Sequence, residues 1–166
     1  WDLGGTRDRY AFADWQHGLA VAALAAGEYR LARAHLERIL DERDSACHYG
    51  IRLRIVGDLA EAITATEGRA VARSVTAALL EETRLAGTPV SRIAGAHATV
   101  LTSNPTSTEE AFCAALALDL EQWPLMRGRL DLAYGSWLRG IHRPVDARSP
   151  LRAARDTFAR LGIRSW

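Results

Sequence analysis

The last quarter of the chain, Arg129–Gly162, reads RLDLAYGSWLRGIHRPVDARSPLRAARDTFARLG and predicts two amphipathic helices with a short break between them. Its apolar residues recur at spacings of three and four, which places them on one face of each helix. Gly135 and Ala147 are small residues on these two faces, so the helices can approach closely. This pattern is typical of a tetratricopeptide-like hairpin, which buries its apolar face by stacking on similar hairpins.

Earlier parts of the chain repeat this pattern less regularly. We expect four helical hairpins, at about 6–42, 45–86, 89–123 and 124–162. A small residue of the second helix recurs at Ala32, Ala72, Ala111 and Ala147, in steps of 40, 39 and 36 residues. These steps are longer than the ~34 residues of the standard repeat. The sequence therefore predicts one all-α domain over 1–166, a tetratricopeptide-like superhelix; a non-repetitive helical bundle is the alternative.

Several helix boundaries can be predicted. Residues 1–5 are expected to be a loop, with Thr6 capping the first helix. The third helix is expected to run unbroken through Ile51 and Ile63. Gly87 and Pro89 mark the end of one helix and the start of the next. Pro150 is in conflict with a last helix that begins near Pro144, because proline removes a hydrogen bond inside a helix. That helix is expected either to start near Ser149 or to have distorted first turns.

Composition narrows the class of protein. The 21 basic residues, all arginine, nearly balance 20 acidic ones to a net charge of +1, which argues against DNA binding by these residues. Two cysteines are too few for a disulfide scaffold. No apolar run approaches the ~20 residues of a membrane span. We expect a cytoplasmic protein, and the start at Trp1 without Met suggests a piece of a longer polypeptide.

No catalytic constellation is evident in the sequence. The five histidines lack the spacing of a metal motif, and there is neither a nucleophile elbow nor a phosphate-binding glycine loop. Trp15, Trp123 and Trp137 lie where packing between hairpins would use them. We therefore expect no enzyme activity, no catalytic or metal-binding residue and no cofactor in these residues.

A ligand of such a repeat protein would bind to the concave side, which the first helices of the hairpins line. Counted from Ala20, Ala60 and Gly135, the side chains expected to face this groove are Asp14, His17, Arg54, Glu61, Arg129 and Arg139. The alternative for each is an ordinary surface residue.

Residues 129–166 also resemble a known family, the large ATP-binding regulators of the LuxR type, at the end of their helical-repeat region. The family's familiar form has an ELAYGEWLRR helix, an arginine-rich turn and a DAREHLRAALETFERLG helix. The matching positions here are Leu132, Ala133, Tyr134, Gly135, Trp137, Leu138, Arg139, Asp146, Ala147, Arg148, Leu151, Arg152, Ala153, Ala154, Phe158, Leu161, Gly162 and Trp166. Ser149, Pro150 and Ser165 depart from the family's pattern.

The resemblance implies a bacterial transcription regulator with an ATPase domain before this segment and a helix-turn-helix domain after Trp166. ATP and DNA would then bind only to those absent domains. This segment would be a non-enzymatic, effector-sensing and protein-interaction part, with a protein or small-molecule effector on its concave face and self-association as a further option. The alternative function is a free-standing tetratricopeptide adaptor that binds a partner's peptide.

Overall fold

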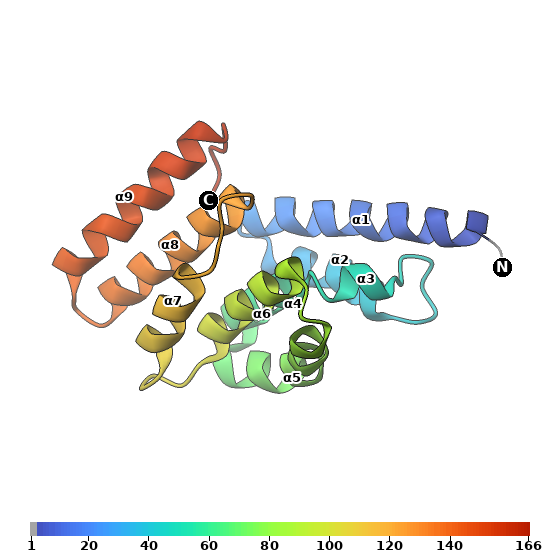
Figure 1. Cartoon of the computed structure of the whole chain (residues 1–166), viewed down its shortest axis with the longest axis horizontal. Coiled ribbons are helices and arrows are strands. Elements are labelled where there is room, and N and C mark those ends of the chain that lie inside the picture. The colour runs from blue at the N-terminus through green and yellow to red at the C-terminus, as the bar shows by residue number, and fades with distance from the viewer. Residues whose placement is uncertain (1–2) are drawn as a thin grey trace. The chain divides into compact units, whose positions relative to one another are not determined.

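A computed structural model describes the backbone of Leu3–Trp166 and the side chains of Asp8–Trp166. Over these residues all regular secondary structure is helical, without a strand (Figure 1), which confirms the predicted all-α class. The nine helices of the described part are α1 (Leu3–Ala25), α2 (Tyr29–Leu40), α3 (Tyr49–Arg52), α4 (Val56–Glu67), α5 (Arg69–Ala86), α6 (Pro89–Thr102), α7 (Thr108–Leu116), α8 (Pro124–Gly140) and α9 (Pro144–Arg160). None of them is long and apolar enough to cross a membrane.

The chain divides into two compact units after Pro105. The first unit, residues 1–105, contains α1 to α6, and the second, residues 106–166, contains α7 to α9. The sequence pattern predicts a single repeat domain over 1–166. The division falls inside the expected hairpin 89–123, because α6 belongs to the first unit and α7 to the second.

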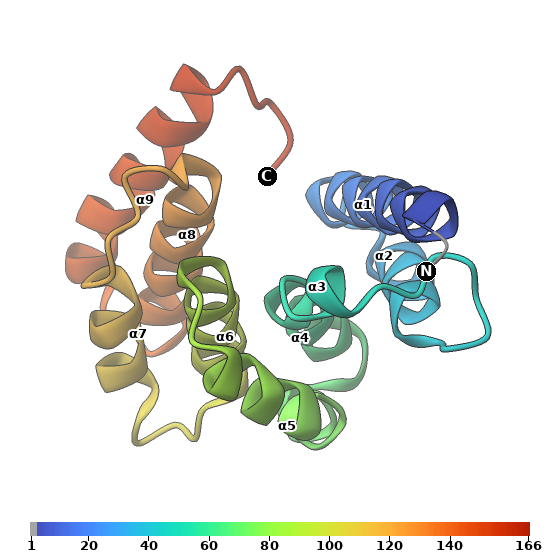
Figure 2. The same cartoon turned by 45° about the vertical axis from the view of Figure 1, so that its right-hand side comes forward.

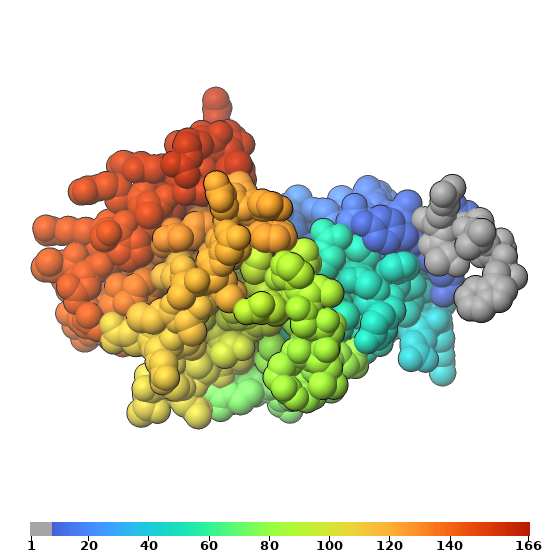
Figure 3. Space-filling view, in the orientation of Figure 1, coloured from blue at the N-terminus to red at the C-terminus, as the bar shows by residue number. Residues whose placement is uncertain are grey.

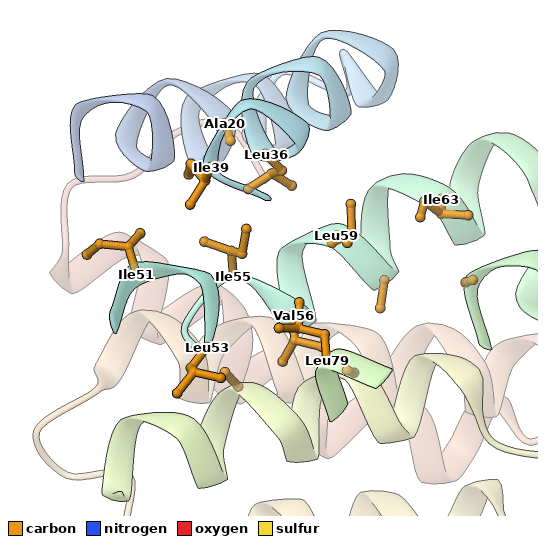
Figure 4. Packing of buried hydrophobic residues seen from close by; sticks show 14 of the residues in the cluster. Ala20, Leu36, Ile39, Ile51, Leu53, Ile55, Val56, Leu59, Ile63 and Leu79 are labelled. Atoms are coloured by element: carbon orange, nitrogen blue, oxygen red, sulfur yellow. The ribbon is translucent and has the colours of Figure 1, made fainter. Parts of the chain in front are cut away.

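Helix α4 is the centre of the first unit, and α1, α2, α5 and α6 pack around it (Figure 2). Seven of its residues are buried, since neighbours cover it on several sides. Figure 4 shows Ile55 and Leu59 directed from the start of α4 toward Leu36 and Ile39 of α2. Burial of such side chains is worth roughly 1.5–3 kcal/mol each, so this contact holds the two hairpins together.

The expected third helix is in fact two helices, and this prediction was wrong. The short α3 ends at Arg52, and α4 starts only at Val56. Leu53, Ile55 and Val56 are all buried in the core cluster. One straight helix would place Leu53 and Val56 on the same face but would turn Ile55 to another face, because successive residues are rotated by about 100°. The break at residues 53–55 lets all three enter the core.

Other boundaries agree with the sequence in part. Gly87 ends α5 with a left-handed φ of 61°, and Thr88 caps α6 by accepting a 3.2 Å hydrogen bond from the Ser91 backbone N–H. This confirms the predicted stop and restart. The expected loop over 1–5 was wrong from Leu3 onward, where α1 begins. Trp1 and Asp2 lie outside the described residues, as does the side chain of the expected cap, Thr6.

In the second unit, α8 and α9 form a close hairpin. A Cβ atom built on Gly135 would lie 2.5 Å from Cγ of Leu151, so glycine is what allows this approach. Helix α9 begins at Pro144 and keeps Pro150 in its interior, so the alternative start near Ser149 was wrong. Helix α7 packs on α8 through the ring of Phe112, which lies 5.0 Å from the ring of Tyr134.

The tryptophans do not all follow the expectation of packing between hairpins. Trp137 contacts Phe112, with ring centroids 5.9 Å apart. Trp15, by contrast, is 57% exposed on α1, so the expectation was wrong there.

Candidate functional site

Two side chains of α1 reach the beginning of α4. Nε2 of His17 lies 2.6 Å from Oδ2 of Asp58, and both side chains are largely buried, with exposed fractions of 16% and 6%. One turn away, Nη1 of Arg54 lies 3.5 Å from Oδ1 of Asp14, and this pair is about half exposed. Three of the four residues expected in the first unit therefore lie along one contact between α1 and the α3–α4 segment.

The fourth residue, Glu61, continues the row on α4 toward α6. Its Oε2 lies 3.5 Å from Nε2 of His97, whose side chain is only 1% exposed. The imidazole of His97 packs directly on Gly57, where a Cβ atom would come 2.6 Å from Nδ1. Gly57 thus makes room for His97 beside the carboxylate of Glu61.

These contacts define a polar row along α4, made of Asp14, His17, Arg54, Asp58, Glu61 and His97. Asp58 and Glu61 are three residues apart and so share one side of α4, and Arg54 lies in the break just before this helix. The row offers hydrogen-bond donors and acceptors of both charges, and its open end is the exposed pair of Asp14 and Arg54. No group of three or more His, Cys, Asp or Glu side chains in the described part of the chain is arranged to hold a metal ion.

The remaining two candidates belong to the second unit and differ from each other. Arg139 is exposed near the end of α8, as expected of a surface residue. Arg129 is only 3% exposed, so the expectation that it faces an open groove was wrong. Its guanidinium carbon lies 4.7 Å from the ring centroid of Trp166, which is itself stacked on Phe158. The C-terminal tail therefore covers Arg129 within the unit.

The second unit contains a polar cluster that the sequence analysis missed. Glu109 on α7 accepts hydrogen bonds of 2.8 and 2.9 Å from Arg143, the residue before α9, and one of 3.3 Å from the hydroxyl of Tyr134 on α8. Burial, together with the negative charge of Glu109, raises the pKa of Tyr134. Because Glu109 of α7 contacts Tyr134 of α8 and Arg143 of the α8–α9 turn, the cluster joins α7 to the α8–α9 hairpin.

An open pocket of about 390 Å³ also lies in the second unit, between the α7–α8 loop and the end of α9. Its lining carries charges of both signs, from Asp119 and Glu121 and from Arg127 and Arg160. Arg127 already donates a 3.0 Å hydrogen bond to Asp131. The pocket therefore has no excess of one charge that would select an ionic ligand.

Asp58 and His97 are the members of the polar row that sequence reasoning missed. The sequence could have predicted Asp58 as a member of the row, because it follows Arg54 by four residues and precedes Glu61 by three, the spacing of one helix face. His97 carried no such signal, since its partner Glu61 is on another helix. Comparison of the chain with protein-family models, with curated proteins and with solved structures finds no match.

Proposed function

We propose that this chain is a non-enzymatic, effector-sensing and protein-interaction segment of a bacterial transcription regulator of the LuxR type, acting in the cytoplasm. The likeness of residues 129–166 to the end of that family's helical-repeat region supports the proposal. The all-helical fold of the described residues is consistent with it.

A tetratricopeptide-like superhelix is part of this proposal, and the first unit supports it. Two hairpins, α1–α2 and α4–α5, carry buried alanines in the same register: Ala20 and Ala32 in one, Ala60 and Ala72 in the other. Each pair is 12 residues apart, and the two pairs are offset by 40 residues. Matching positions of this kind are what stacked repeats require.

The polar row is the observation that carries the effector-binding part of the proposal. Its exposed pair joins Asp14 of α1 to Arg54, just before α4, so a ligand bound there contacts more than one hairpin. Such a ligand favours the arrangement of helices that it binds more tightly. The size of the shift is set by the difference between its affinities for the two arrangements. The exposed Asp14 and Arg54 would make the first contacts with a polar effector or with a peptide's charged side chains.

A binding screen tests this assignment. Thermal-shift measurements of the chain against metabolites and peptides should identify a stabilising compound, since a ligand of the native state raises its stability. Arg54→Ala should then weaken binding about 10-fold, which corresponds to about 1.4 kcal/mol. Arg84→Ala, in an exposed ion pair on α5, is the matched control and should bind as the parent does. Equal affinity of Arg54→Ala and the parent would place the effector elsewhere.

The reading frame downstream of Trp166 tests the regulator itself. A helix-turn-helix domain encoded directly after this segment would support the proposal. A stop codon at that point would exclude it and would favour the free-standing adaptor, whose peptide ligand the same screen would reveal.

A further inference from the structure

Helix α1 carries a second surface, which faces away from the core of the first unit. It consists of Trp15, Leu19 and Ala22, at spacings of four and three, and we call it the α1 outer stripe. Trp15 is 57% exposed, Ala22 is exposed and Leu19 is half-buried. Part of the α1 surface, in blue, is visible on the face drawn in Figure 3. An exposed tryptophan beside other apolar side chains is typical of an interaction site.

The matching positions of α4 indicate what this stripe contacts. The 40-residue offset that relates Ala20 to Ala60 also relates the α1 outer stripe to Ile55, Leu59 and Ala62. These three residues are buried, with exposed fractions of 0%, 2% and 0%. Ile55 and Leu59 point toward Leu36 and Ile39 of α2 (Figure 4), so on α4 the equivalent stripe receives a helix.

The aromatic end of the stripe is held in position before any partner binds. The rings of Phe12 and Trp15 lie 5.6 Å apart. The guanidinium of Arg38 on α2 lies 5.2 Å from the centroid of Phe12, and its Nε donates a 2.8 Å hydrogen bond to Asp44. Such preorganisation lowers the entropic cost of association.

We propose that the α1 outer stripe binds an amphipathic helix of a partner protein, one that presents leucine or isoleucine at positions i and i+3 as α2 presents Leu36 and Ile39. A second copy of this chain is the less suitable occupant. Among the described residues, no helix has an exposed Leu or Ile pair at that spacing; α5 offers only two valines, Val71 and Val75, which are four residues apart. Pairing through those valines would be head-to-tail and would form rings or open chains instead of a two-fold symmetric dimer.

A helical peptide tests this binding, which does not depend on the proposed regulator function. The probe is a hydrocarbon-stapled peptide with the sequence of residues 29–41, titrated calorimetrically into the 166-residue chain. Stapling is needed because a free helix of this length is marginal in water. We expect saturable binding that is at least about 10-fold weaker to Trp15→Glu than to the parent. Trp15 is mostly exposed, so this variant should retain the parent's circular dichroism spectrum.

Two controls make the result specific. Leu85→Glu changes another exposed apolar residue, 71% exposed on α5, and should bind the peptide as the parent does. A peptide with Leu36→Glu and Ile39→Glu should not bind. Absent binding of the parent peptide, or equal binding by Trp15→Glu, would overturn the proposal. A dimer in sedimentation velocity that Trp15→Glu dissociates would also overturn it, because the occupant would be a second copy.

Discussion

Nε2 of His17 and Oδ2 of Asp58 lie 2.6 Å apart and connect α1 to α4 across 41 residues of sequence. An ionised carboxylate only accepts hydrogen bonds, so Nε2 of His17 is the donor when Asp58 is ionised. The contact joins the first hairpin to the central helix of the first unit. It lies in the largely buried part of the polar row, whereas Asp14 and Arg54 form its exposed end.

Replacing His17 should therefore destabilise the first unit. His17→Ala removes a partner of the Asp58 side chain, which is 6% exposed, and we expect the free energy of unfolding to fall by roughly 1–3 kcal/mol. Urea unfolding followed by circular dichroism measures the change. Arg84→Ala, which removes an exposed ion pair, should leave the unfolding midpoint unchanged. A midpoint equally unchanged in His17→Ala would show that this contact contributes nothing to stability.

Two glycine substitutions should have effects of opposite sign. In Gly135→Ala the new Cβ would lie 2.5 Å from Cγ and 3.2 Å from the backbone nitrogen of Leu151, so α8 and α9 must move apart. We expect a loss of roughly 1–3 kcal/mol in the free energy of unfolding. Gly18→Ala on α1 meets no atom within 4 Å and should gain up to about 1 kcal/mol from helix propensity. Thermal unfolding of both variants measures these changes. Midpoint temperatures that shift in the same direction in Gly135→Ala and Gly18→Ala would contradict the predicted clash at Leu151.

Pro150 should weaken α9, in whose interior it lies. Pro150→Ala restores a backbone N–H that can bond to the carbonyl four residues earlier, that of Asp146. We expect a net gain of roughly 1–2 kcal/mol, less than the full cost of an interior proline, because proline also restricts the unfolded chain. Chemical denaturation gives the difference, and amide exchange at residue 150 reports the new bond. A less stable alanine variant would mean that packing of the proline ring outweighs the lost bond.

Asp131 should make stability depend on pH in the acid range. Burial raises the pKa of its carboxyl group, although the hydrogen bond from Arg127 opposes this. A raised pKa means that the folded state holds the proton more tightly than the unfolded state. The contribution of Asp131 to stability is therefore greatest at low pH and is lost as pH rises from the ordinary pKa of aspartate through the raised one.

The Asn variant isolates this contribution. Asp131→Asn keeps the size of the side chain and an acceptor for Arg127 but does not titrate. The free energy of unfolding, measured from about pH 4 to about pH 7, should decline less with pH in Asp131→Asn than in the parent. The other titrating groups are common to both proteins, so the difference between the two curves belongs to Asp131. Parallel curves for the two proteins would contradict the raised pKa.

The sequence by itself determined the helical class and much of the helix order. The spacing of apolar residues at three and four, interrupted at Gly27, Gly87 and Pro124, is a local property, and helices form from local contacts. The same local pattern located four members of the polar row, Asp14, His17, Arg54 and Glu61. The close approach of α8 and α9 was also readable, because Gly135 lies on the apolar face of its helix.

Tertiary structure alone decided the rest. Whether residues 45–67 form one helix or two depends on how Leu53, Ile55 and Val56 share a core whose other residues are far away in sequence. Arg129 looked like a surface residue because its cover, Trp166, is a tail residue that returns to it from the far end of the hairpin. His97 joins Glu61 only because α6 packs on α4 at Gly57. Contacts between segments distant in the chain have no periodic signature, so the sequence indicates which faces are apolar but not which faces meet.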